Sequence, residues 1–182
     1  MTVATRALLD ADFTHVSPTT LTALKPKQAQ AVVRVINPLI ADAYVVYLKT
    51  KNFHWHLSDS HFRDHHLMLD EHADQLLGST DPLAERVRKL GGTTLRSISH
   101  ISALQTISDD QDEAVSPLEM LTRLMNDSKA LASNQRAAHH LCEANRDYST
   151  ASLLELIIDE TERRTWVLFE AVQGLEHTRQ VG

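Results

Sequence analysis

Two pairs of metal-binding side chains occur in one segment of the chain, each with its members four residues apart. His66 and Asp70 form the first pair, Asp81 and Glu85 form the second, and His54 precedes both. Residues four apart project from the same face of a helix, so each pair could grip a metal ion from two sides. Imidazole and carboxylate donors without a thiolate favour iron or manganese, with zinc as an alternative in a site that keeps an open position.

The separation of the two pairs indicates that one chain does not complete a site by itself. Asp70 and Asp81 are eleven residues apart, so an ideal helix places them on nearly the same face and about 16 Å apart along its axis. One metal centre cannot span that distance. An antiparallel second copy would bring the second pair of one chain against the first pair of the other, because a two-fold contact is reciprocal. The spacing therefore predicts two sites per dimer, each shared between subunits.

Each pair also has an ordinary structural explanation. His66 and Asp70 could contribute only surface electrostatics. Asp81 is followed by Pro82, which is the pattern of a helix N-cap with a proline in the first turn. Glu85 could lie on a solvated helix face. The pairs alone therefore leave ligation and structural roles both open.

His54 and the adjacent Trp55 stand near the expected end of the preceding helix. A histidine there could complement the negative end of the helix dipole, and Trp55 could pack in the core or in an interface. No Glu-x-x-His sequence occurs anywhere in the chain. That motif is typical of di-iron centres built within a single ferritin-type bundle, so such a centre is not expected.

The composition predicts that helices carry these residues. The chain has 182 residues with only five glycines and five prolines, and this length suits one domain with a substantial core. Apolar residues recur at helical spacing in four segments, at about 27–55, 60–90 and 116–142 and from about residue 150 onward. Residues 93–115 predict a crossover with one short helix, and thus a four-helix bundle without strands.

Turn and cap residues refine the helix boundaries. Ser116 and Pro117 are the types expected of an N-cap and a first helical residue, and Glu119 completes a capping box. A glycine pair directly after the second segment ends it. Pro38 could mark the start of the first helix or bend it, and Pro82 predicts a kink in the second.

The charge and the cysteine content limit the classes of function. A formal net charge of -6 does not favour binding to a polyanion such as DNA. Cys142 is the single cysteine, so we expect no intrachain disulfide, a buried thiol and a reducing compartment. Without a signal-peptide pattern or a run of about 18 apolar residues, the sequence predicts a cytoplasmic protein that does not span a membrane.

Four segments of the chain together resemble the Dps family, the mini-ferritins also known as DNA-binding proteins from starved cells. The segments are KNFHWH, FRDHHLMLDEHADQL, DPLAERVRKLGGTTLRSI and TASLLELIIDETERRTWVLFEA. The resemblance covers about residues 28–172. We expect a ferritin-like bundle over residues 27–176, with a flexible tail over 1–26 and a short tail over 177–182.

The resemblance implies a ferroxidase. The family's iron ligands match His54, His66, Asp70, Asp81 and Glu85 without substitution, in a site that lies across a two-fold interface. It also implies a hollow shell of twelve subunits with a di-iron centre at each site. Such a shell oxidises Fe(II), usually with hydrogen peroxide in preference to dioxygen, and stores the ferric mineral inside.

Further family features bear on other residues. Trp55 lies beside the ligands and could orient water or scavenge an oxidising equivalent, or it could only pack. Asp147 falls where the family's three-fold pores often carry an acidic residue, and Glu143 precedes it by one turn. Both are candidates for a pore that concentrates Fe(II), with ordinary solvated residues as the alternative.

DNA binding is the weaker expectation from the family. Many members hold DNA with a lysine-rich tail, whereas residues 1–27 carry three basic and two acidic residues. Phosphate contacts dominate DNA affinity, so we expect weak or absent DNA binding. A nucleoid-associated structural protein with a secondary metal site is the alternative function.

Overall fold

The computed structural model describes residues 21–181, with side chains placed through residue 177, and it is helical without strands over that range. Its helices are α2 (Pro26–His56), α3 (Phe62–Lys89), α4 (Ile98–Leu104), α5 (Pro117–Ala144) and α6 (Tyr148–Val181). This confirms the predicted all-α fold with a short helix in the crossover. Most of the expected N-terminal tail lies outside the described residues. The expected C-terminal tail is instead the last part of α6, up to Val181.

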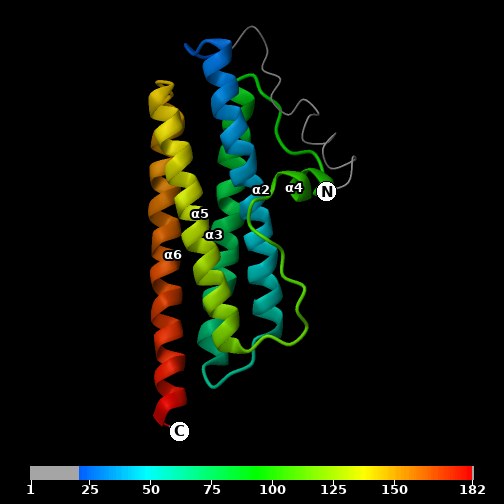
Figure 1. Cartoon of the computed structure of the whole chain (residues 1–182), viewed down its shortest axis with the longest axis vertical. Coiled ribbons are helices and arrows are strands. Elements are labelled where there is room, and N and C mark those ends of the chain that lie inside the picture. Colours follow the sequence, from blue (N-terminus) through cyan, green and yellow to red (C-terminus); the bar gives the residue numbers. More distant parts are fainter. Residues whose placement is uncertain (1–20, 182) are drawn as a thin grey trace.

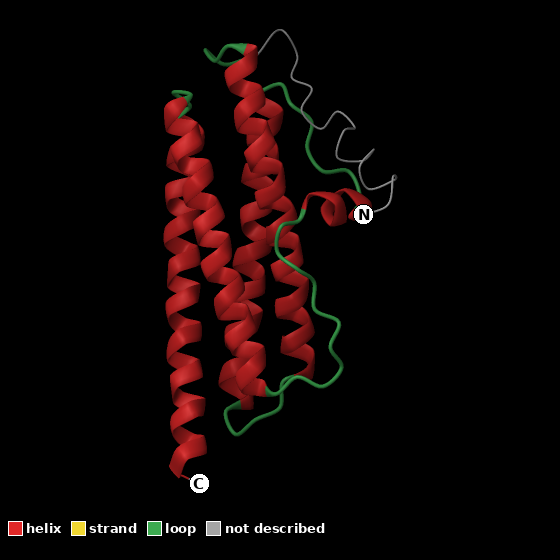
Figure 2. Ribbon diagram, viewed as in Figure 1, coloured by secondary structure: helices red, strands yellow, loops and turns green. Residues whose placement is uncertain are grey.

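The four long helices run side by side along the long axis of the molecule (Figure 1). α2 packs mainly on α3 and α5 packs mainly on α6, while contacts between α2 and α5 join the two pairs. The connection from α3 to α5 returns along the bundle and holds α4 against α2 (Figure 2). A single long crossover of this kind is the connection of ferritin-like bundles.

Apolar side chains from the four long helices form the core. The largest cluster includes Ile36 of α2, Val87 of α3 and Leu154 of α6, all without exposed surface. Burying each such side chain stabilises the fold by about 1.5–3 kcal/mol. Cys142 of α5 belongs to the same cluster, and burial raises the pKa of its thiol to about 12. The predicted buried position of the cysteine is therefore confirmed.

The glycine pair after α3 ends the helix as predicted. Gly91 has a φ of 79°, a backbone conformation that glycine adopts without steric cost. A Cβ at Gly92 would lie 2.7 Å from Cγ2 of Val33. The second glycine therefore allows the end of α3 to approach α2 closely.

Ser116 caps α5, because its Oγ accepts from the main-chain N of Glu119 at 3.3 Å. The carboxylate of Glu119 pairs with Arg123 one turn later. Pro38 and Pro82 both lie inside helices. Since α3 is continuous from Phe62 to Lys89, the interpretation of Asp81 as an N-cap is wrong.

Among residues 21–181, α2 is the one helix that is long and apolar enough to cross a membrane by length and composition. Its 18-residue window has a mean hydropathy of 1.5, which corrects the expectation that the chain has no apolar run of about this length. In the bundle, 61% of that window is buried. Because the core helix of a soluble bundle passes the same test, the apolar run is weak evidence for a membrane span.

Candidate metal centre

His54 and His66 stack where the end of α2 meets the first turns of α3. Their ring centroids are 3.7 Å apart and their planes differ by 22°. Nδ1 of His54 lies 2.9 Å from the main-chain oxygen of His66, and Nδ1 of His66 lies 3.0 Å from the main-chain oxygen of His54. A carbonyl oxygen only accepts, so each Nδ1 carries the hydrogen. In the neutral rings, both Nε2 lone pairs are therefore left for a metal ion.

Asp70 lies beside the two histidines, with its Oδ1 3.9 Å from Nε2 of His54. We refer to His54, His66 and Asp70 as the His54 group. Nζ of Lys51 lies 2.6 Å from the same Oδ1. The hydrogen bond and the charge of Lys51 hold the pKa of Asp70 below its ordinary value, with smaller contributions from the two histidines. The carboxylate is therefore ionised and can exchange the ammonium group for a metal ion.

Asp81 and Glu85, which we call the Asp81 pair, lie further along α3. Because the helix is continuous from Asp70 to Asp81, the rise per residue separates these two by about 16 Å. Both members of the pair are exposed, and Glu85 forms a surface ion pair with Lys89 at 2.9 Å. A single chain thus brings the His54 group together and leaves the Asp81 pair apart.

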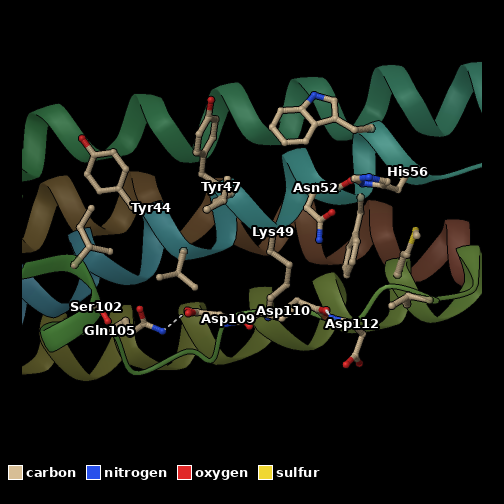
Figure 3. A pocket seen from close by; sticks show the side chains of 18 of the residues that line it. Tyr44, Tyr47, Lys49, Asn52, His56, Ser102, Gln105, Asp109, Asp110 and Asp112 are labelled. Atoms are coloured by element: carbon tan, nitrogen blue, oxygen red, sulfur yellow. Dashed lines mark hydrogen bonds between the residues drawn. The ribbon is translucent and has the colours of Figure 1, made fainter. Parts of the chain in front are cut away.

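A groove with a volume of about 850 Å³ lies between α2 and the crossover. In Figure 3, Tyr44 and Asn52 of α2 line one side of the groove, and the crossover segment 109–112 lines the other. The lining includes large apolar side chains that are more than half exposed: Leu48, Trp55 and Ile98. Exposed apolar side chains gathered along a groove make this face a candidate binding surface.

Asp42 of α2 holds the crossover wall of this groove in place. Its buried carboxylate accepts from the main-chain N of Thr106 at 2.6 Å and of Ile107 at 3.0 Å. The hydroxyl of Thr106 donates to it as well, at 2.7 Å. With a longer bond from the side-chain amide of Asn134 at 3.4 Å, four hydrogen bonds to one buried carboxylate fasten this wall to α2.

The two candidate pore residues have different surroundings. Asp147 is 2% exposed, and its carboxylate accepts from Arg86 at 2.6 Å and from the main-chain N of Thr150 at 3.2 Å. These contacts give Asp147 the position of the N-cap of α6. Glu143 lies on the last turn of α5 with 54% of its side chain exposed.

Lys51 is the residue of this site that sequence reasoning missed. It precedes His54 by three residues on the same helix, a spacing that puts two side chains on one face. A lysine one turn before a predicted ligand was the available signal. Its contact with Asp70, which lies on the next helix, could not be read from that spacing.

A ferritin-like domain family matches residues 34–177. The DNA protection during starvation protein of Halobacterium salinarum is 33% identical over 138 residues, which cover 74% of this chain and 74% of the relative. This chain belongs to the Dps family of the ferritin-like superfamily. An uncharacterized low temperature-induced protein of Nostoc sp. is 31% identical over 154 residues, covering 83% of this chain and 85% of the relative.

Among solved structures, this Dps family chain is similar to DpsC from Streptomyces coelicolor. The TM-score is 0.84 at 25% sequence identity, and the match covers 88% of this chain and 94% of the other. The likeness extends over nearly the whole bundle. It confirms the ferritin-like four-helix fold that the four sequence segments implied.

Proposed function

We propose that this Dps family protein stores and detoxifies iron as a ferroxidase. It oxidises Fe(II) at sites shared across a two-fold interface, with hydrogen peroxide rather than dioxygen as the preferred oxidant. The ferric mineral is kept inside a hollow shell of twelve subunits. The observation that supports the proposal is the reciprocal bonding of His54 and His66, which leaves both Nε2 lone pairs available to a metal ion, with Asp70 next to Nε2 of His54.

The donor set suits iron as a substrate. Imidazole nitrogens and carboxylate oxygens bind Fe(II), and a site made of two separate halves lets the ion exchange. Each half supplies only two or three donors, which leaves positions for the oxidant. Two Fe(II) ions each give one electron to hydrogen peroxide, the O–O bond breaks, and two hydroxide ions form without release of a hydroxyl radical. Lys51 bonds to Oδ1 of Asp70, so Fe(II) competes with this ammonium group for that oxygen.

The groove between α2 and the crossover supports a second copy of the chain as the occupant of this face. A partner would cover the exposed apolar side chains of the groove. An isologous contact would also bring the Asp81 pair of one subunit to the His54 group of the other. Trp55 would lie in the same interface, next to the ligands, where we propose that it orients water or scavenges an oxidising equivalent.

DNA protection by a nucleoid-associated protein is the second candidate function. Several relatives are named DNA protection during starvation proteins, but a formal charge of -6 per chain opposes contact with phosphate. We expect weak or no DNA binding at physiological salt, and a cytoplasmic location. A tight gel shift that persists at moderate salt would reverse this ranking.

Iron oxidation in assembled shells tests the proposed activity. Fe(II) is mixed anaerobically with hydrogen peroxide, and iron retained in the particle fraction is followed for the native protein and for Asp81→Ala, Glu85→Ala. We expect at least a tenfold loss of rate in this variant, with the shell intact. A matched variant, Asp159→Ala, Glu176→Ala, removes two exposed carboxylates from α6 and should behave like the native protein.

Equal rates in all three proteins would return the Asp81 pair to a surface role. Metal analysis of freshly purified protein would then decide between manganese and zinc as the bound ion.

A further inference from the structure

Two adjacent histidines near the end of α5 face a carboxylate one turn later. Nδ1 of His139 lies 3.5 Å from Oε2 of Glu143, and Nδ1 of His140 lies 3.6 Å from the same oxygen. One donor atom from each of the three side chains lies within 4.8 Å of the others. This cluster shares no residue with the His54 group or the Asp81 pair, which lie on α2 and α3.

The two separations are longer than a usual hydrogen bond and agree with the spacing of ligands around one ion. A hydrogen bond between nitrogen and oxygen is usually about 2.9 Å long, which is shorter than either distance. Two ligands that each lie about 2.1 Å from a tetrahedral zinc ion are about 3.4 Å apart. The observed 3.5 and 3.6 Å match that spacing.

Glu155 of α6 orients the ring of His139. Its Oε1 lies 3.2 Å from Nε2 of His139, and an ionised carboxylate only accepts, so Nε2 carries the hydrogen. In the neutral ring, the lone pair is then on Nδ1, the atom that faces Glu143. A carboxylate bonded to the far nitrogen of a ligand histidine is the usual way to fix its tautomer. His139 is only 15% exposed, so the ring is held between two helices.

The tight turn between α5 and α6 maintains this arrangement. α5 ends at Ala144 and α6 begins at Tyr148. The main-chain N of Asp147 donates to the oxygen of Cys142 at 2.9 Å, while the carboxylate of Asp147 binds Arg86 of α3. The start of α6 is therefore anchored to two other helices, which holds Glu155 beside α5.

We propose that His139, His140 and Glu143 bind a divalent transition-metal ion of the zinc, cobalt or copper class, with Glu155 as the orienting acceptor. Two imidazoles and one carboxylate are a ligand set that these ions take. Because His140 is 78% exposed and Glu143 is 54% exposed, water completes the coordination and the ion exchanges with the solution. Acid weakens the site, since the ligands must be deprotonated.

Equilibrium dialysis of assembled protein against Zn²⁺ tests this site. The parent protein carries Asp81→Ala and Glu85→Ala, which removes half of the proposed iron site, and the His54 group is the same in every protein compared, so it does not contribute to the difference in zinc binding. We expect His139→Ala, His140→Ala to bind about one zinc ion per chain fewer than the parent. Glu155→Gln should keep the ion but bind it about 10–100-fold more weakly. His177→Ala, which removes an exposed histidine from α6, should match the parent.

Equal zinc binding by the parent and the double-histidine variant would overturn the site. If that variant does not assemble, Glu143→Gln decides, because it removes the ligand charge at nearly constant volume. Loss of the same zinc ion in Glu143→Gln supports the site, and full zinc binding by Glu143→Gln overturns it.

Discussion

Lys51 and Asp70 form an ion pair at 2.6 Å in the place where the proposed iron site needs a free carboxylate. The pair joins α2 to α3 beside the stacked histidines, so the His54 group is ordered before any metal ion arrives. At the proposed site, Fe(II) would therefore compete with an ammonium group for this carboxylate oxygen. Lys51 thus balances the charge of Asp70 in the single chain, and this should lower the affinity of Asp70 for Fe(II).

Replacing the competing lysine should strengthen metal binding. We expect Lys51→Met to raise the affinity for Fe(II) severalfold and to return the pKa of Asp70 toward its ordinary value, because the hydrogen bond and charge of Lys51 are the main cause of its lowering. Anaerobic Fe(II) titration of assembled protein measures the affinity. Lys129→Met, which removes an exposed lysine of α5, is the control. Unchanged affinity in Lys51→Met would show that the ion pair does not compete.

The close approach of α2 and α3 at Gly92 should make this position intolerant of a side chain. Gly92→Ala places a Cβ 2.7 Å from Cγ2 of Val33, and overpacking of a core costs about 1–3 kcal/mol. Gly174→Ala has no atom within 4 Å of its Cβ and should stabilise α6 by about 0.5–1 kcal/mol. Calorimetry of both variants measures the two shifts in Tm, and a lower Tm in both would contradict the packing argument.

His72 should make the protein less stable in mild acid. Burial, followed by the charges of Arg164 and Arg163, lowers the pKa of His72 from 6.5 to about 4. Between those values the unfolded chain binds a proton that the folded chain excludes, so the free energy of unfolding falls as the pH falls. The stability is full above about pH 6.5, and its loss is complete, at most about 3 kcal/mol, below about pH 4.

Denaturant unfolding across this pH range checks the effect. His72→Leu should flatten the profile between pH 4 and 6.5, because the titrating group is gone. His177→Ala, at an exposed position of α6, should leave the slope unchanged. A slope that survives in His72→Leu would assign the acid sensitivity to other groups.

Asp147 has two possible roles, as a helix cap and as a pore residue, and the two predict different effects of a substitution. Asp147 is a buried cap paired with Arg86, so Asp147→Asn should lower the free energy of unfolding by about 3 kcal/mol. A pore residue would instead slow the uptake of Fe(II) and leave Tm unchanged. Measuring Tm and uptake in the same samples distinguishes the two. Glu143→Gln is the exposed counterpart, for which we expect an unchanged Tm.

Much of the fold could be predicted because helical periodicity and turn residues are local signals. The Ser116 cap, the glycine stop after α3 and the short helix in the crossover all have the types that their positions require. The spacing of the candidate ligands along α3 likewise follows from helix geometry, although ligation itself does not.

Other features depend on contacts between distant segments. The interpretation of Asp81 as a cap was wrong because α3 accommodates Pro82 without ending, and tertiary packing decides that. Lys51 reaches Asp70 only because α2 and α3 are antiparallel neighbours. The carboxylate of Asp147 pairs with Arg86 of α3, a contact that the sequence does not indicate. No sequence pattern reports these pairings.

The central claim is that each iron site is built from two subunits, and mixed shells test it most directly. One variant, His54→Ala, His66→Ala, lacks the first half-site, and the other, Asp81→Ala, Glu85→Ala, lacks the second. Each alone should be inactive in peroxide-driven Fe(II) oxidation. If both are coexpressed and combine at random, half of the dimers are mixed and each mixed dimer has one intact site. About a quarter of the native activity should then return. Mixed shells that stay as inactive as either variant would contradict a shared site.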